Sequence, residues 1–282
     1  MKKILLFIFS LFFLNLSIVF SQQEESNFAY NVGLDFQTRY IWRGQALGGS
    51  APSLQPGMGI SWKGLSFGVW GAYSLSRNVT QELDLSLSYT FWEDRFTVGI
   101  IDYSFPQEIN QDYNYFDYKQ NGSHVLEAGL TYNGEKNVPV YFSIFTNFYG
   151  ADTKKSIQKD DNTFELNDDG TVKQKNIFST YIELGYNLPW KKLGVEFNIF
   201  AGCALNSYKL DVPDLDINGL PVWITEKQTG FYNNKGFACV NVGITASKTF
   251  EVGKLSIPLS GGLIFNPNDK KAYFMASFGI HL

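Results

Sequence analysis

Apolar residues recur at every second position in about a dozen short segments after the first twenty residues. This period is that of a β-strand with one apolar and one polar face. No segment shows the helical period of an element that would cover the apolar faces. The clearest strand has one face of Leu83, Leu85, Leu87, Tyr89 and Phe91, and another of Glu82, Asp84, Ser86, Ser88 and Thr90. The pattern predicts an all-β transmembrane antiparallel barrel whose apolar outside meets lipid.

The first 21 residues have the pattern of a secretory signal peptide. Lys2 and Lys3 precede an almost uninterrupted apolar run from Ile4 to Phe20, and we expect cleavage after Ser21. An uncleaved membrane anchor is the alternative. Residues 1–21 are therefore predicted to be a signal peptide and residues 22–282 the outer-membrane β-barrel. The predicted location is the cell outer membrane, with its lipid as a partner.

The charge balance argues against nucleic acid as a partner. The chain has 23 Lys and Arg against 27 Asp and Glu, and loss of Lys2 and Lys3 would leave a net charge near −6. Such acidity does not attract a polyanion. Aromatic residues make up 17% of the chain, which suits the aromatic girdles at the two interfaces of a membrane barrel.

Turn residues divide the chain into about twelve strands, give or take two. The lengths of the connections alternate between short and long, as in barrels with short periplasmic turns and long extracellular loops. An even strand count places both termini in the periplasm. The predicted strands are 28–42, 54–62, 65–75, 81–92, 95–105, 123–132, 138–149, 177–188, 193–206, 235–248, 252–265 and 271–282.

The last predicted strand alternates cleanly and ends at Leu282. Such an ending resembles the signal read by the barrel-assembly machinery, although that signal usually ends in an aromatic residue. A secreted β-sandwich also alternates. The long, regular strands and the nearly uncharged apolar faces favour the barrel over this alternative.

Successive side chains of a strand point alternately outward and inward, so the odd or even position of a residue, its parity, predicts which charged side chains point into the lumen. The pore-lining set is Asp35, Arg39, Arg43, Glu82, Asp84, Glu127, Glu183 and Glu196. Charges inside a barrel must be hydrated or paired. Opposed charges would form a pore constriction that selects solutes. Alternatively, the same residues pair with one another and fill a narrow barrel.

Parity also makes predictions for Cys203, Cys239 and Asp102. It places Cys203 on the lipid face and Cys239 on the luminal face, so they cannot meet and two free thiols are expected. It points Asp102 toward lipid, which is costly near the bilayer centre. Asp102 is therefore expected either at the outer rim or after a β-bulge.

The sequence lacks the motifs of an enzyme or a metal site. It contains no Gly-rich phosphate loop and no metal-spaced His and Cys set, so no cofactor, no metal and no catalytic residue are predicted. His124 and His281 are expected near opposite ends of the barrel. A catalytic pairing of His124 with Ser123 or Asp117 is less favoured than a location at a strand start. Asp168-Asp169-Gly170 lacks the spacing of a calcium loop.

Residues 39 to 84 resemble a family of bacterial outer-membrane proteins called TorF-type porins. The similar segments, in order, are Arg39-Tyr40-Ile41-Trp42-Arg43-Gly44, Pro52-Ser53-Leu54-Gln55-Pro56-Gly57, Gly68-Val69-Trp70 and Glu82-Leu83-Asp84. The resemblance implies an outer-membrane barrel with a transport role, and it identifies no solute. Since Arg43, Glu82 and Asp84 all face inward under parity, Arg43 is expected to pair with Glu82 or Asp84. The pairing would span the outer mouth or involve a loop folded into it.

The sequence thus predicts a porin-like channel for passive passage of small polar solutes. One alternative is a non-conducting barrel whose long loops, 106–122, 150–176 and 207–234, bind a ligand or surface as an adhesin or receptor does. A barrel enzyme of phospholipase type is a second, less favoured alternative.

Overall fold

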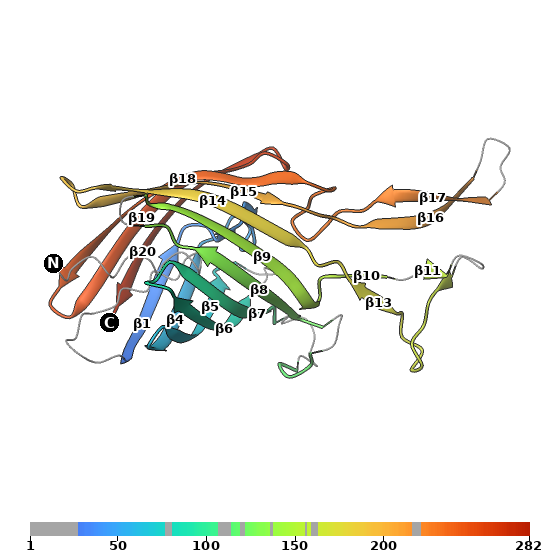
Figure 1. Cartoon of the computed structure of the whole chain (residues 1–282), viewed down its shortest axis with the longest axis horizontal. Helices are drawn as coiled ribbons and strands as arrows, with labels where there is room; N and C mark the ends of the chain where they lie inside the picture. The colour runs from blue at the N-terminus through green and yellow to red at the C-terminus, as the bar shows by residue number, and fades with distance from the viewer. Residues whose placement is uncertain are drawn as a thin grey trace.

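The computed structural model describes residues 28–76, 81–106, 114–118, 122–135, 138–155, 157–158, 163–215 and 221–282. Residues 1–21, predicted to be a signal peptide, lie outside the described part, and that assignment stays a prediction. In the described part, twelve antiparallel strands close into a barrel in the order β1-β20-β19-β18-β15-β14-β9-β8-β7-β6-β5-β4 (Figure 1). No helix among the described residues is long and apolar enough to cross a membrane. The predicted all-β barrel of about twelve strands is confirmed.

The barrel strands are nine to fifteen residues long and follow one another around the wall. They are β1 (Phe28–Gln37), β4 (Ser53–Trp62), β5 (Leu65–Ser74), β6 (Glu82–Phe91), β7 (Phe96–Ser104), β8 (His124–Tyr132), β9 (Val140–Gly150), β14 (Thr180–Trp190), β15 (Val195–Ala204), β18 (Ala238–Val252), β19 (Leu255–Asn266) and β20 (Lys271–His281). Each predicted strand has its counterpart. The turn expected between the predicted strands 235–248 and 252–265 lies at Gly253–Lys254, because β18 runs on to Val252.

The short turns gather at one end of the barrel, called here the short-turn end. The first residue of β1 pairs beside the turn at Lys63–Gly64, and Leu282 bonds to Val32, so the start of β1 and the C-terminus lie at this end. The opposite end, called the long-loop end, carries small hairpins that project beyond the barrel (Figure 1). These are formed by β10 (Thr153–Lys155) with β13 (Gln174–Asn176), β11 (Ile157–Gln158) with β12 (Thr163–Phe164), and β16 (Lys209–Leu215) with β17 (Pro221–Lys227).

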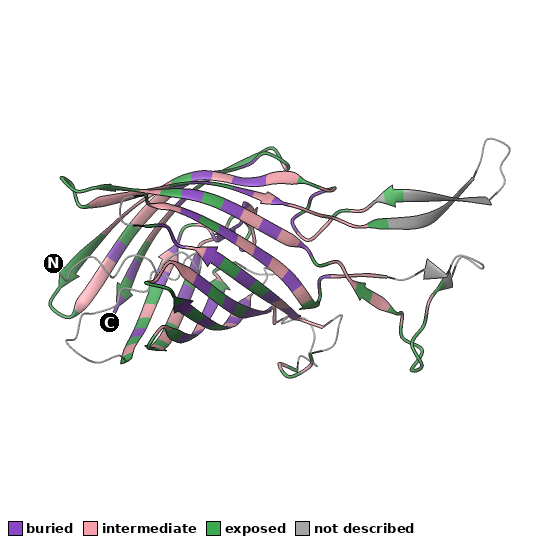
Figure 2. Ribbon diagram, in the orientation of Figure 1, coloured by how far each residue is buried: buried purple, intermediate pink, exposed green. Residues whose placement is uncertain are grey.

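Buried and exposed residues alternate along the barrel strands (Figure 2). The exposed side chains are mostly apolar and the buried ones mostly polar, which is the reverse of a soluble protein. Apolar side chains such as Leu34, Ile60 and Leu87 are exposed on the outside, whereas polar ones such as Gln55 and Ser88 are buried inside. Each strand has period two, so its apolar set must share one face. The exposed apolar face is what a lipid environment would cover.

The first long connection turns back into the barrel. β1 ends at Gln37, and the next residues form a small hairpin, β2 (Ile41–Trp42) and β3 (Gln45–Ala46). Arg43 and Gly44 form its two-residue turn with φ of 45° and 76°, values typical of a type I′ turn. The predicted strand 28–42 is therefore wrong after Gln37, because the Arg43-Gly44 turn reverses the chain inside the lumen.

A β-bulge overturns the parity prediction for the two cysteines. Gly202 pairs with Asn241 but Cys203 pairs with Cys239, so Val240 is the extra residue. Val240 and Asn241 are both buried, which leaves Cys239 on the same outward side as Cys203. Both cysteines carry free thiols, but they lie opposite each other on neighbouring strands.

Candidate functional site

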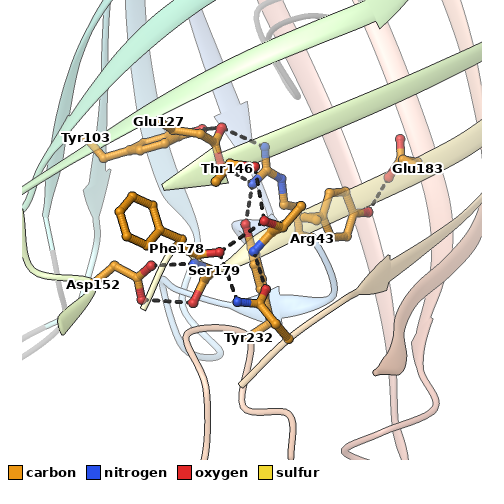
Figure 3. A network of polar contacts seen from close by, with 12 residues as sticks. Arg43, Tyr103, Glu127, Thr146, Asp152, Phe178, Ser179, Glu183 and Tyr232 are labelled. Carbon is orange, nitrogen blue, oxygen red and sulfur yellow. Dashed lines mark hydrogen bonds and ion pairs between the residues drawn. The ribbon is translucent and has the colours of Figure 1, made fainter. Parts of the chain in front are cut away.

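The tip of the inward hairpin carries Arg43 into a polar network inside the barrel (Figure 3). Its guanidinium forms a bidentate pair with Glu127 of β8, with Nη2 donating to Oε1 at 2.8 Å and Nη1 to Oε2 at 2.5 Å. Nη1 also donates to the Tyr232 hydroxyl at 2.6 Å, and Tyr103 donates to Glu127 at 2.9 Å. Bidentate carboxylate pairing fixes the guanidinium in position as well as neutralising it.

Aromatic rings enclose the same guanidinium. Its central carbon lies 4.6 Å from the ring centre of Trp42, 4.3 Å from Phe145 and 4.7 Å from Tyr181. Trp42 stacks on Tyr232 at 5.7 Å. Arg43 is 2% exposed, and contacts of this kind stabilise a cation that has lost its water. The hairpin tip is therefore docked by charge and by packing together.

A second carboxylate lies next to this cage. Glu183 of β14 accepts hydrogen bonds from Tyr141 at 2.9 Å, from Asn241 at 3.1 Å and from Tyr181. Tyr181 belongs to both groups, since its ring also faces Arg43. The two buried carboxylates are thus linked through one aromatic residue.

Loop residues close the network from the long-loop end. Ser179 donates to Asp152 through its backbone N at 2.8 Å and its hydroxyl at 2.9 Å, joining the ends of one long loop (Figure 3). Burial raises the pKa of the Asp152 carboxyl, and the Ser179 hydrogen bonds oppose that shift. Burial also raises the pKa of Tyr232 well above its ordinary value, so its hydroxyl stays protonated.

The luminal charges do not form the pairs that parity predicted. Arg43 pairs with Glu127 rather than with Glu82 or Asp84, because the hairpin carries it across the lumen to β8. Arg39 lies in the same inward segment, half-buried, with its guanidinium 5.8 Å from the Tyr273 ring. Both arginines therefore belong to the inward loop, not to a strand.

The remaining predicted residues all lie on inward positions of barrel strands. Asp35 lies 3.1 Å from His281, and Glu196 is half-buried with one unpartnered oxygen. Glu82 and Asp84 are buried, and no ion pair joins either to a described residue. The predicted pore-lining set lacks Tyr103, Tyr181 and Tyr232. Parity with Glu183 would have found Tyr181, whereas Tyr232 lies in a long loop that carries no periodic signal.

Packing differs between the two ends of the lumen. Tyr181 and Tyr232 are fully buried near the long-loop end, and Glu127 is 1% exposed there. Toward the short-turn end, small polar inward residues are half-buried on one wall: Asn198, Thr245, Ser247, Ser260 and Ser277. The inward hairpin and its partners thus fill the long-loop half, and one wall of the other half retains partly accessible polar surface.

His124 and Asp102 form a buried pair on the outward side of the barrel wall, beneath Tyr115 and Tyr118. Nδ1 of His124 lies 2.7 Å from Asp102, and Nε2 lies 2.6 Å from the Tyr115 carbonyl oxygen. Tyr118 donates to Asp102 at 2.6 Å, and Asp102 raises the pKa of Tyr118 in addition to burial. The pairing of β7 with both neighbours is unbroken, so Asp102 lies near the long-loop end without a bulge. His124 does begin a strand, but its acidic partner is Asp102.

The family of the chain follows from comparison with known proteins. A model described as a bacterial protein of unknown function (Gcw_chp) matches residues 21–211. The chain belongs to this family. No curated protein matches the sequence. Because the family description carries no function, the TorF-type resemblance stays a prediction.

Several solved outer-membrane proteins have similar structures. The NanC porin has a TM-score of 0.42 and 11% identity over 89% of this chain and 98% of its own. An outer membrane channel from Pseudomonas putida F1 has a TM-score of 0.42 and 12% identity over 89% and 94%. OprD from Pseudomonas aeruginosa has a TM-score of 0.32 and 12% identity over 93% and 67%. The barrel assignment for this chain rests on its own strand pairing.

Proposed function

We propose that this protein is a porin-like channel of the bacterial outer membrane that passes small polar solutes. The observation that supports it is a closed barrel with an apolar outside and a polar inside. That distribution suits a lipid exterior and a hydrated interior. We further propose that the inward segment, residues 38–52, is the constriction, because its Arg43 is held in the long-loop half of the lumen.

Single-channel conductance of the full-length protein, exported and then extracted from membranes in detergent, tests this proposal. We expect low-conductance openings from the wild type, because the docked hairpin narrows the lumen. Arg43→Ala should raise the mean conductance several-fold and shift the ion preference. Arg95→Ala is the matched control, since Arg95 lies in a short turn and pairs with Glu93 at the surface.

A second candidate function is binding by the long loops of a non-conducting barrel. The packed long-loop half and the hairpins β10–β13 and β16–β17 that project beyond it favour this alternative. Silence in the bilayer from both the wild type and Arg43→Ala would support it, provided that both proteins keep the heat-modifiable gel mobility of a folded barrel. That result would contradict the channel proposal.

A further inference from the structure

One wall of the lumen carries buried polar atoms that lack hydrogen-bond partners. They lie on the neighbouring strands β1, β4, β5 and β6. Near the long-loop end five of these atoms are acceptors and one is a donor: Oε1 of Gln37, Oε1 of Gln55, both carboxylate oxygens of Glu82, Oδ1 of Asp84 and Nε1 of Trp70. The unpartnered hydroxyls of Ser66 and Ser88 lie toward the short-turn end. Buried polar groups are nearly always paired, so such a group of orphan atoms needs an explanation.

Strand pairing places these side chains in adjacent positions. Trp70 lies opposite Asp84, and Ala72 lies opposite Glu82. The pairing of Leu54 with Tyr73 and of Gly57 with Trp70 puts Gln55 opposite Ala72. The small Ala72 therefore separates Gln55 from Glu82 on one row. Gln37 joins the group through Ser53, its strand partner, which accepts a hydrogen bond from Gln55 at 3.0 Å.

The wall carries two carboxyl groups, and neither is paired with a cationic side chain among the described residues. Glu82 is 2% and Asp84 9% exposed, and they are two residues apart on one face of β6. Arg43, which was expected to pair with one of these two carboxylates, is paired with Glu127 instead. Two neighbouring carboxylates taken out of water are costly without a counter-charge.

Aromatic rings border the same place. Tyr40, from the inward segment, lies with its ring 5.5 Å from that of Trp70. Trp70 is 6% exposed and its indole nitrogen has no partner. Acceptor oxygens beside aromatic faces are the surroundings that suit an organic cation.

We propose that this wall, which we call the acidic wall (Gln37, Gln55, Trp70, Glu82 and Asp84), binds the ammonium or guanidinium group of a small organic cation. The N–H donors of such a group match the surplus of acceptors, and its charge neutralises the carboxylates. A water molecule would satisfy oxygen atoms but leave the like charges uncompensated. Among the described residues, no group of three or more His, Cys, Asp or Glu could hold a metal ion.

The proposal deepens the channel function and rests on it for the route by which the cation arrives. Tyr40 belongs to the inward segment and covers the acidic wall, so displacement of this segment would open both the lumen and the site. The solute class selected by the channel would then be small cations rather than anions or neutral solutes.

Calorimetric titration of methylguanidinium chloride into the full-length protein in detergent tests the site without requiring conduction. We expect saturable binding that weakens at least tenfold in the Glu82→Gln/Asp84→Asn variant. The variant should fold, because it removes two uncompensated charges. Glu93→Gln/Asp94→Asn makes the same chemical changes in the short turn after β6 and should bind like the wild type.

Two further ligands separate the possible causes of binding. Tetramethylammonium has charge but no N–H donor, so it should bind at least tenfold more weakly than methylguanidinium. Absence of saturable methylguanidinium binding, equal binding by the Glu82 and Asp84 variant, or preferential binding of calcium would each overturn the proposal. Binding by a barrel that is silent in the bilayer would keep the site and reject the channel, whereas conduction without binding would reject only the site.

Discussion

Arg43 illustrates how a single residue can organise the lumen of this barrel. It is a cation buried among aromatic rings, and its charge is balanced by Glu127 alone of the described carboxylates. The pair joins a loop to a strand 84 positions away. A buried ion pair adds little stability relative to apolar residues, but breaking it on one side is costly. The geometry of the pair, rather than its energy, explains how the hairpin is held in one position.

Removal of the Glu127 carboxylate tests this account at the residue scale. We expect Glu127→Ala to lower the free energy of unfolding by about 3–5 kcal/mol, because it leaves Arg43 buried without a counter-charge. The double variant Arg43→Met/Glu127→Leu should recover most of that loss. Urea unfolding in detergent, followed by tryptophan fluorescence, measures both. Equal destabilisation by the single and double variants would contradict the charge explanation.

Gly44 offers a second residue-scale prediction. Its φ is 76°, and an added Cβ would lie 1.9 Å from the Val240 carbonyl oxygen. Gly44→Ala should therefore undock the hairpin tip and expose Arg43 to trypsin, with cleavage detected by mass spectrometry. Gly49→Ala is the control, since Gly49 has a similar φ of 65° but nothing within 4 Å of its Cβ position. Protection of Arg43 in Gly44→Ala would show that the tip can shift without undocking.

At the scale of elements, the inward hairpin and the β18 bulge depend on each other. The bulge turns Val240 inward, and the Val240 backbone lies against Gly44. Asn266 of β19 also donates to the Gly44 carbonyl at 3.0 Å. A β-bulge changes the face on which the following side chains lie, while the strand continues. The wall of the barrel is therefore shaped locally to receive the hairpin tip.

The same bulge predicts the chemistry of the cysteine pair. Opposed residues of antiparallel strands have Cα atoms about 4.5–5.5 Å apart, within the range that a disulfide requires. Diamide should therefore convert both thiols of the folded barrel into an intramolecular disulfide. Thiol titration after unfolding measures the loss, and Cys203→Ser should keep its single thiol without dimer formation. Two thiols surviving in the oxidised wild type would contradict this prediction.

At the scale of the whole molecule, the barrel has an apolar outer face, which suits lipid, and a polar interior. The outward faces of consecutive strands carry exposed Leu, Ile, Val and Phe, whereas inward Ser, Thr, Asn and Gln are buried. Soluble monomeric proteins rarely expose large contiguous apolar surfaces. The projecting hairpins all lie at the long-loop end, which leaves the short-turn end compact (Figure 1).

Placing a charge on the outward face tests this arrangement. Leu87 lies near the middle of β6 and is 51% exposed, whereas Leu75 lies just after β5 and is 57% exposed. An arginine at the bilayer centre costs about 2–4 kcal/mol, and near zero at the interface. Leu87→Arg should therefore reduce insertion into lipid vesicles, measured by heat-modifiable mobility, while Leu75→Arg should not. Equal insertion of both would contradict a lipid-facing outer surface.

The sequence was sufficient to predict the class of fold, the number of barrel strands and the alternation of short turns with long loops. These features follow from local periodicity and turn residues, and both act over a few positions. The tertiary structure alone decided that Arg43 meets Glu127, and that Tyr232, 189 positions away, packs against it. Parity fails at Arg43 and at Cys239, where a turn and a bulge each break the strict alternation. The turn and the bulge are matched by contacts across the lumen, which alternation along a single strand does not reveal.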